Sequence, residues 1–122
     1  MARNSIEAHE ETARWEVQLR KGVLEFAILL TLRGGEHYGF ELVTSLTSKA
    51  RINVPEGTIY PLLLRLAKDG LIKSEMRDGE GGAPRKYYTL TPRGVVLLEA
   101  MIPRWKQLST SVEGLLAGEE ND

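Results

Sequence analysis

The 122-residue sequence contains no cysteine, and this absence excludes disulfides, thiolate metal sites and a cysteine nucleophile. It also lacks a long apolar run. The most apolar stretch, residues 23–32, is about half as long as the roughly 20 residues of a membrane helix, and Glu25 interrupts it. No basic segment followed by an apolar one marks a secretory leader. We therefore expect one compact domain in the cytoplasm, without a membrane span.

Catalytic and metal-binding patterns are missing as well. His9 precedes Glu10, but position 13 is alanine, so the zinc-protease helix pattern fails, and His37 has no second ligand at metal spacing. The glycines of residues 79–82 lie inside a predicted hairpin, whereas a phosphate cradle lies between a strand and a helix. We expect no catalytic residue, no metal and no cofactor.

Net charge is also small, at -1, although proteins that bind DNA obtain much of their affinity by neutralising phosphates. The total conceals a segregation along the chain. Residues 49–93 carry nine basic and five acidic side chains, a balance of +4, whereas residues 94–122 carry two basic and five acidic ones, a balance of -3. The middle of the chain is therefore suited to a polyanion, and the tail is not.

Hydrophobic spacing predicts a helical chain interrupted by one hairpin. The expected elements are a polar amphipathic arm over residues 5–21, a central apolar helix over 21–33, a second helix over 39–48 that packs Phe40, Val43 and Leu46, an extended link over 50–54, a third helix from Pro55, strands over 71–77 and 85–90, and a last helix from Pro92 capped by Thr91. This order predicts a winged helix-turn-helix, an α+β fold that is mainly helical. The expected units are an N-terminal arm (1–21), the winged domain (22–91) and a C-terminal dimerisation helix with an acidic tail (92–122).

The third helix is predicted to pack one side and present the other. A helical wheel places Ile59, Leu62, Leu63 and Leu66 on one side, Gly57, Pro61, Leu64 and Lys68 opposite them, and Thr58 with Arg65 on one flank. In a winged helix the third helix enters the major groove of DNA, and the wing contacts the backbone or the minor groove. Hydroxyls of Thr58 and Tyr60 suit phosphates or base edges, and Arg65 adds charge. The alternatives are a packed Tyr60 and a solvated Arg65.

The predicted hairpin joins a glycine-rich tip to two adjacent cations, Arg85 and Lys86, and to two tyrosines. Neighbouring residues of a strand point to opposite faces, so either Tyr87 or Tyr88 should pack inward. By itself the segment is equally consistent with an ordinary surface hairpin. The candidate DNA contacts are Tyr38, Gly57, Thr58, Tyr60, Pro61, Arg65, Lys68, Arg85 and Lys86.

The last helix carries apolar residues at alternating steps of three and four, the seam of a two-helix packing. They are Leu98, Met101, Trp105, Leu108, Val112 and Leu115. A single helix cannot bury this seam, so we expect it to form a dimer interface, although part of it can also lie on the domain's own core.

Three strings resemble the PadR-type transcriptional regulators. They are residues 57–72, which include the run from Gly57 to Leu63, residues 82–94 in the wing, and residues 37–42 at the second helix. The chain is similar to the short branch of that family, which lacks the larger effector domain. The resemblance implies a homodimer on a pseudo-palindromic double-stranded DNA operator, usually repressing a neighbouring gene.

Some short members of this family bind planar aromatic compounds between the paired tryptophans of the last helix, so the resemblance makes Trp105 a candidate effector contact. The alternative for Trp105 is plain interface packing. For the whole chain, the leading hypothesis is a repressor relieved by such an effector. Its rivals are a winged-helix adaptor that binds a protein and never DNA, and an enzyme.

Overall fold

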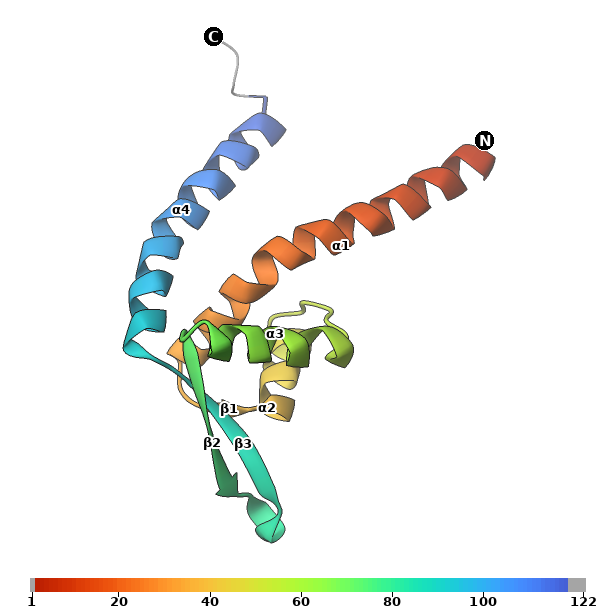
Figure 1. Cartoon of the computed structure of the whole chain (residues 1–122). Coiled ribbons are helices and arrows are strands. Elements are labelled where there is room, and N and C mark those ends of the chain that lie inside the picture. Colours follow the sequence, from red (N-terminus) through yellow and green to blue (C-terminus); the bar gives the residue numbers. More distant parts are fainter. Residues whose placement is uncertain (1, 119–122) are drawn as a thin grey trace.

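The computed structural model describes residues 2–118 as a mainly helical fold with one small antiparallel sheet (Figure 1). In chain order the elements are α1 (Ala2–Arg33), β1 (His37–Tyr38), α2 (Gly39–Thr44), the π-helical turn η1 (Ser45–Lys49), α3 (Glu56–Lys68), β2 (Ile72–Asp78), the 3-10 turn η2 (Glu80–Gly82), β3 (Pro84–Leu90) and α4 (Pro92–Leu116). This order confirms the α+β winged helix expected from the sequence. The acidic tail, residues 119–122, lies outside the described residues.

The first helix, α1, is continuous over 32 residues, so the predicted arm and the predicted central helix are a single element. Gly22 lies where the two were expected to meet, and one glycine costs a helix only about 1 kcal/mol. The C-terminal half of α1 is buried, with Ile28 and Leu29 at 0% exposure. Its N-terminal half projects from the body of the protein, and α1 and α4 diverge from one another (Figure 1).

The three strands form an antiparallel sheet in the order β1-β3-β2. The β2–β3 hairpin is the predicted wing, and Ile72 pairs with Leu90 at its base. Strand β1 was not predicted as a strand, because its two residues are held by pairing with β3, far along the chain. As expected, one tyrosine packs inward: Tyr88 is 8% exposed, whereas Tyr87 lies on the opposite face.

The second helix begins at Gly39 as predicted and continues from α2 into η1. Val43 and Leu46 are buried, but Phe40, which was expected to pack, is 63% exposed. The link that follows is not extended at its start, because Arg51 adopts a left-handed backbone conformation (φ 59°). This turn leads the chain back toward α3.

Helix α3 buries the side that the helical wheel predicted. Ile59, Leu63 and Leu66 are all 0% exposed in the core, and Leu62 packs against them while partly exposed. The helix continues through Pro61, and the side opposite the core is exposed to solvent.

The last helix, α4, begins with the predicted cap. The Thr91 hydroxyl accepts a hydrogen bond from the Gly94 amide (3.0 Å) and donates one to the Gly70 carbonyl (2.6 Å). A Cβ on Gly94 would lie 2.0 Å from the Leu71 carbonyl oxygen, so this close approach of α4 to the sheet requires glycine. Leu98 is 1% exposed. The heptad had predicted Leu98 at the dimer interface, but Leu98 packs in the chain's own core.

Candidate nucleic-acid interface

Helix α3 presents an outer stripe of exposed residues spaced four, three and four apart: Gly57, Pro61, Leu64 and Lys68. Leu64 is the large apolar member and is 68% exposed. Because the opposite side of α3 is buried, this outer stripe is the part of the helix that a groove can receive. The sequence predicted these positions correctly, although Leu64 was not among the candidate contacts.

One flank of α3 faces α1. The Arg65 guanidinium donates to the Glu25 carboxylate at 2.9 Å, and Thr58 lines a hollow together with Lys21 and Leu24 of α1. Two predicted DNA contacts, Arg65 and Thr58, are therefore turned toward α1, and an intramolecular partner engages Arg65. This ion pair could not be predicted from local sequence, because the two residues lie 40 positions apart.

The other flank of α3 faces α2 through Tyr60, which is 40% exposed. A Cβ on Gly39 would lie 2.8 Å from Cε1 of the Tyr60 ring, so the α2 backbone approaches the ring closely. Tyr60 also lies near Tyr88. Burial raises the pKa of the Tyr88 hydroxyl above its ordinary value, and Tyr60 adds a smaller effect in the same direction.

On the outer face of the wing, two arginines and two tyrosines form a stacked row. The Arg77 guanidinium lies 4.2 Å from the centre of the Tyr87 ring, the rings of Tyr87 and Tyr38 meet edge to face at 5.5 Å, and the Arg85 guanidinium lies 4.3 Å from the centre of the Tyr38 ring. Such cation–π and edge-to-face contacts each contribute about 0.5–1.5 kcal/mol. The row fixes the wing against β1 at the entrance of α2.

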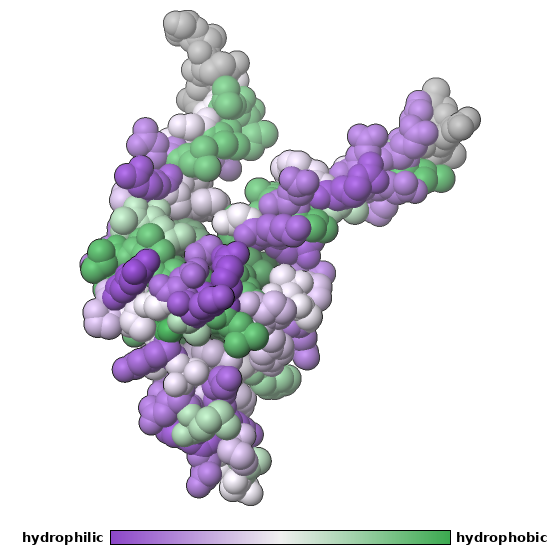
Figure 2. Space-filling view, in the orientation of Figure 1, coloured by the Kyte–Doolittle hydropathy of each residue, from purple (hydrophilic) through white to green (hydrophobic). Residues whose placement is uncertain are grey.

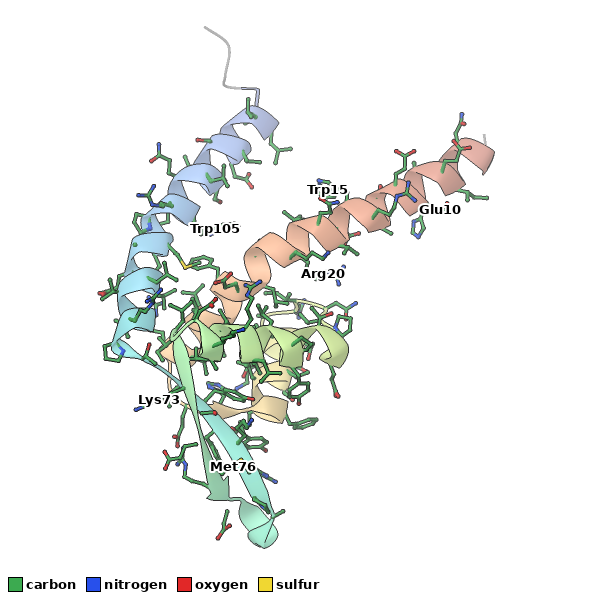
Figure 3. The ribbon with its side chains drawn as sticks, viewed as in Figure 1. Glu10, Trp15, Arg20, Lys73, Met76 and Trp105 are labelled. Atoms are coloured by element: carbon green, nitrogen blue, oxygen red, sulfur yellow. The ribbon has the colours of Figure 1, made fainter. Side chains whose placement is uncertain are left out.

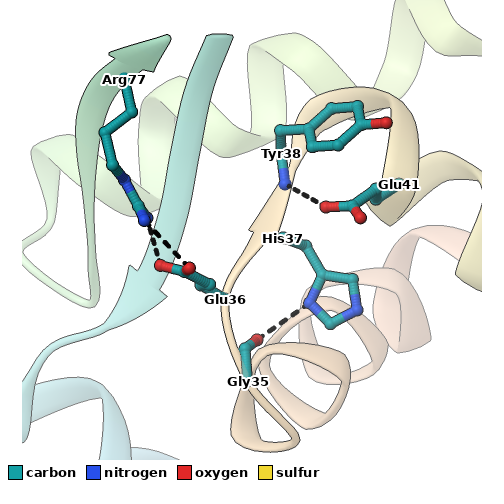
Figure 4. A network of polar contacts seen from close by, with 6 residues as sticks. All are labelled: Gly35, Glu36, His37, Tyr38, Glu41 and Arg77. Carbon is teal, nitrogen blue, oxygen red and sulfur yellow. Dashed lines mark hydrogen bonds and ion pairs between the residues drawn. The ribbon is translucent and has the colours of Figure 1, made fainter. Parts of the chain in front are cut away.

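Glu36 anchors this row from the loop before β1 (Figure 4). Its carboxylate accepts two hydrogen bonds from the Arg77 guanidinium, one of them 3.0 Å long. This hydrogen bonding lowers the pKa of Glu36 and raises the pKa of Arg77. Beside it, the Glu41 carboxylate accepts a hydrogen bond from the Tyr38 amide at 3.0 Å (Figure 4), which orients Tyr38 at the start of α2.

The structure therefore brings Tyr38, Tyr60 and Arg85 together around the start of α2. Lys86 is exposed but points to the other face of the wing, because neighbours in a strand alternate. Sequence reasoning missed Arg77 in this group. The predicted hairpin contained the signal, since Arg77 pairs directly with Arg85 and paired residues share a face.

A second candidate site is a pocket of about 460 Å³ between α1 and α4. Its lining is mainly apolar and contains one cation: Gln18, Leu19, Gly22, Val23, Phe26, Met101, Arg104, Trp105 and Leu108. The Trp105 ring lies 5.9 Å from the Phe26 ring at 45°. In Figure 2, hydrophobic side chains gather along α4 on the side toward α1, and Figure 3 shows Trp105 on that side and Trp15 farther out on α1.

The arrangement of α2, α3 and the β2–β3 hairpin defines a winged helix-turn-helix protein. A model of the PadR-like family of transcriptional regulators matches residues 28–100, which are more than half of the chain. The chain therefore belongs to the PadR-like family of transcriptional regulators.

Individual relatives agree with this assignment. The chain is 33% identical over 97 residues to a transcriptional regulator of Mycobacterium tuberculosis, covering 80% of this chain and 89% of that one. A PadR family regulator from Eggerthella lenta superposes with a TM-score of 0.80 at 34% identity, covering 95% and 99% of the two chains. Bacillus subtilis PadR in complex with operator DNA superposes with a TM-score of 0.61 at 29% identity, covering 66% of this chain and 45% of that one.

Within residues 2–118 there is neither a membrane-spanning helix nor a metal-binding cluster. No helix in this part of the chain is long and apolar enough to cross a membrane. No cluster of histidine and acidic side chains there has the grouping that would hold a metal ion.

Proposed function

We propose that this protein is a homodimeric regulator that binds operator DNA and represses transcription until a small molecule binds. One observation carries the DNA-binding part: all four residues of the outer stripe of α3 are exposed, and Arg85 of the wing lies against Tyr38 at the start of α2, the helix that precedes α3. The similar structure of Bacillus subtilis PadR, which is in complex with operator DNA, supports DNA binding by this chain. As a regulator of bacterial type, it would act in the cytoplasm, where the chromosome lies.

In this mode α3 enters the major groove. Gly57 has open space around its Cα, so the backbone approaches the DNA closely, and Lys68 reaches a phosphate at the other end of the stripe. At the start of α2, Tyr38 and Tyr60 place their hydroxyls where they can reach the phosphate backbone of the DNA. Arg85 and Lys86 contact phosphates on the two sides of the wing.

The homodimer is supported by apolar residues that one chain leaves uncovered. On α4, Trp105, Leu108, Val112 and Leu115 are between 43% and 61% exposed, and on α1 Trp15 is 61% exposed. A second copy that packs against both helices would bury these side chains. Because Leu98 is buried in the core and Met101 is only partly buried against it, the seam starts at Met101 in this proposal. Two-fold symmetry would then match a pseudo-palindromic operator.

The effector site is proposed to be the pocket between α1 and α4, completed by the second copy. Two Trp105 rings at the two-fold axis would stack on a planar aromatic molecule. Arg104, the cation in the lining, favours a molecule that carries negative charge.

Helix α1 provides a physical connection from this pocket to α3. Residues 18, 19, 22, 23 and 26 line the pocket, whereas Arg20 donates to the Asn53 carbonyl at 2.7 Å just before α3, and Glu25 pairs with Arg65 within it. A shift of α1 would therefore move α3. An effector releases DNA only when it binds the DNA-free geometry more tightly than the DNA-bound one.

Fluorescence anisotropy tests the function with a labelled duplex selected from a random pool by the full chain. Three cations per protomer, Lys68, Arg85 and Lys86, would release about six counterions from a dimer, so the affinity should fall about 10³-fold between 50 and 200 mM salt. The double variant Arg85→Gln and Lys86→Gln should bind weakly, whereas Lys106→Gln on α4 should bind normally. Failure to bind any duplex would favour the protein-binding adaptor.

A further inference from the structure

The outer stripe of α3 contains almost no side chain that can form hydrogen bonds. Between Gly57 at one end and Lys68 at the other lie only Pro61 and Leu64. Thr58 and Arg65, on one flank of α3, face α1. The Arg65 guanidinium is paired there with the Glu25 carboxylate at 2.9 Å. The outer stripe itself therefore offers no arginine, asparagine or glutamine, the side chains that distinguish bases by bidentate hydrogen bonds.

Leu64 nevertheless extends into solvent from the middle of the stripe and is 68% exposed. In the major groove the one apolar feature of a base edge is the C5-methyl group of thymine. Pro61, one turn earlier on the same stripe, has an apolar side chain and therefore adds no side-chain donor or acceptor beside Leu64.

We propose that Leu64 is a specificity determinant that reads a thymine methyl group in each half-site of the operator. The proposal rests on the DNA binding proposed above and assigns to it a particular contact. It also explains the apolar outer stripe: Leu64 loses its exposed surface when the helix enters the groove, and the methyl group is the partner that the groove offers.

The test replaces each thymine of the selected duplex, one at a time, by deoxyuridine. This change deletes the 5-methyl group and keeps every hydrogen-bonding group. For the wild-type protein, one position in each half-site should raise Kd by about fourfold, the equivalent of one buried methyl group. Leu64→Ala should bind the same duplex with no difference between thymine and deoxyuridine at that position.

The matched control is Val96→Ala, which truncates a side chain of similar exposure (67%) on α4 and should keep the fourfold penalty. Circular dichroism should show that both variants fold. If the wild-type protein binds the duplex but no deoxyuridine weakens it, or if Leu64→Ala retains the penalty, this inference is wrong and DNA binding stands. If the protein selects no duplex, DNA binding and this inference both fail.

Discussion

The contact between Gly39 and Tyr60 offers a prediction in which folding and DNA binding respond differently to one methyl group. A Cβ at position 39 would lie 2.8 Å from Cε1 and 3.1 Å from Oη of Tyr60. The ring must therefore swing away in Gly39→Ala. Because Tyr60 is 40% exposed, it has room to move outward, at a cost of about 0.5–1.5 kcal/mol for a distorted rotamer.

The same substitution favours the helix. Alanine is better than glycine in a helix by up to about 1 kcal/mol, so the free energy of unfolding of Gly39→Ala should stay within about 1 kcal/mol of the wild type. A displaced Tyr60 hydroxyl should lose its hydrogen bond to a DNA phosphate, worth about 1.5–3 kcal/mol, and Kd should rise about tenfold or more. Urea unfolding and fluorescence anisotropy measure the two quantities.

A double-mutant cycle isolates the cause. In the Tyr60→Ala background the added methyl group meets no ring, so Gly39→Ala should leave Kd unchanged. Gly22→Ala is the matched control, since a Cβ at position 22 has nothing within 4 Å. An unchanged Kd for Gly39→Ala, or a penalty that persists without the Tyr60 ring, would refute the placement of Tyr60 at the interface.

Three further predictions concern the wing, the dimer and the effector. Arg77 lowers the pKa of Glu36 below its ordinary 4.5. Their pair therefore stabilises the fold fully above about pH 4.5, and less as the pH falls. Glu36→Gln should lower the free energy of unfolding at pH 7 and change it less at pH 3. Truncation after Arg104 removes most of the exposed seam, so sedimentation should show monomers with little affinity for the duplex; a truncated dimer would contradict this. In the Trp15→Phe background, planar anionic dyes should quench Trp105 and weaken DNA binding, and equal dye affinity in Trp105→Ala would move the site elsewhere.

The features of this fold that depend on residues close together in the chain could be predicted from the sequence. The inner and outer sides of α3 and the inward tyrosine of the wing follow from the period of a helix or a strand, and the Thr91 cap follows from the pairing of a side-chain acceptor with proline at a helix start. Strand β1 was missed because its residues become a strand only by pairing with β3. The role of Leu98 was also misread, because a heptad shows which residues are apolar and does not show whether the chain or a partner covers them.

The candidate interface was predicted in part. Tyr38, Tyr60 and Arg85 lie together around the start of α2, whereas Arg65 and Thr58 face α1. Local sequence could not reveal the partner of Arg65, since Glu25 reaches it only after α1 packs across α3. The stacked row on the wing likewise depends on the register that pairs Arg77 with Arg85.

Hydroxyl-radical footprinting tests the central claim most directly. The full chain, bound to its selected duplex, should protect two symmetric segments whose centres lie about one helical turn apart, roughly 10 base pairs, as expected for two α3 helices in successive major grooves. Protection of a single segment would contradict the dimeric mode of binding. An unprotected duplex, at protein concentrations that saturate an anisotropy signal, would contradict docking through α3 and the wing.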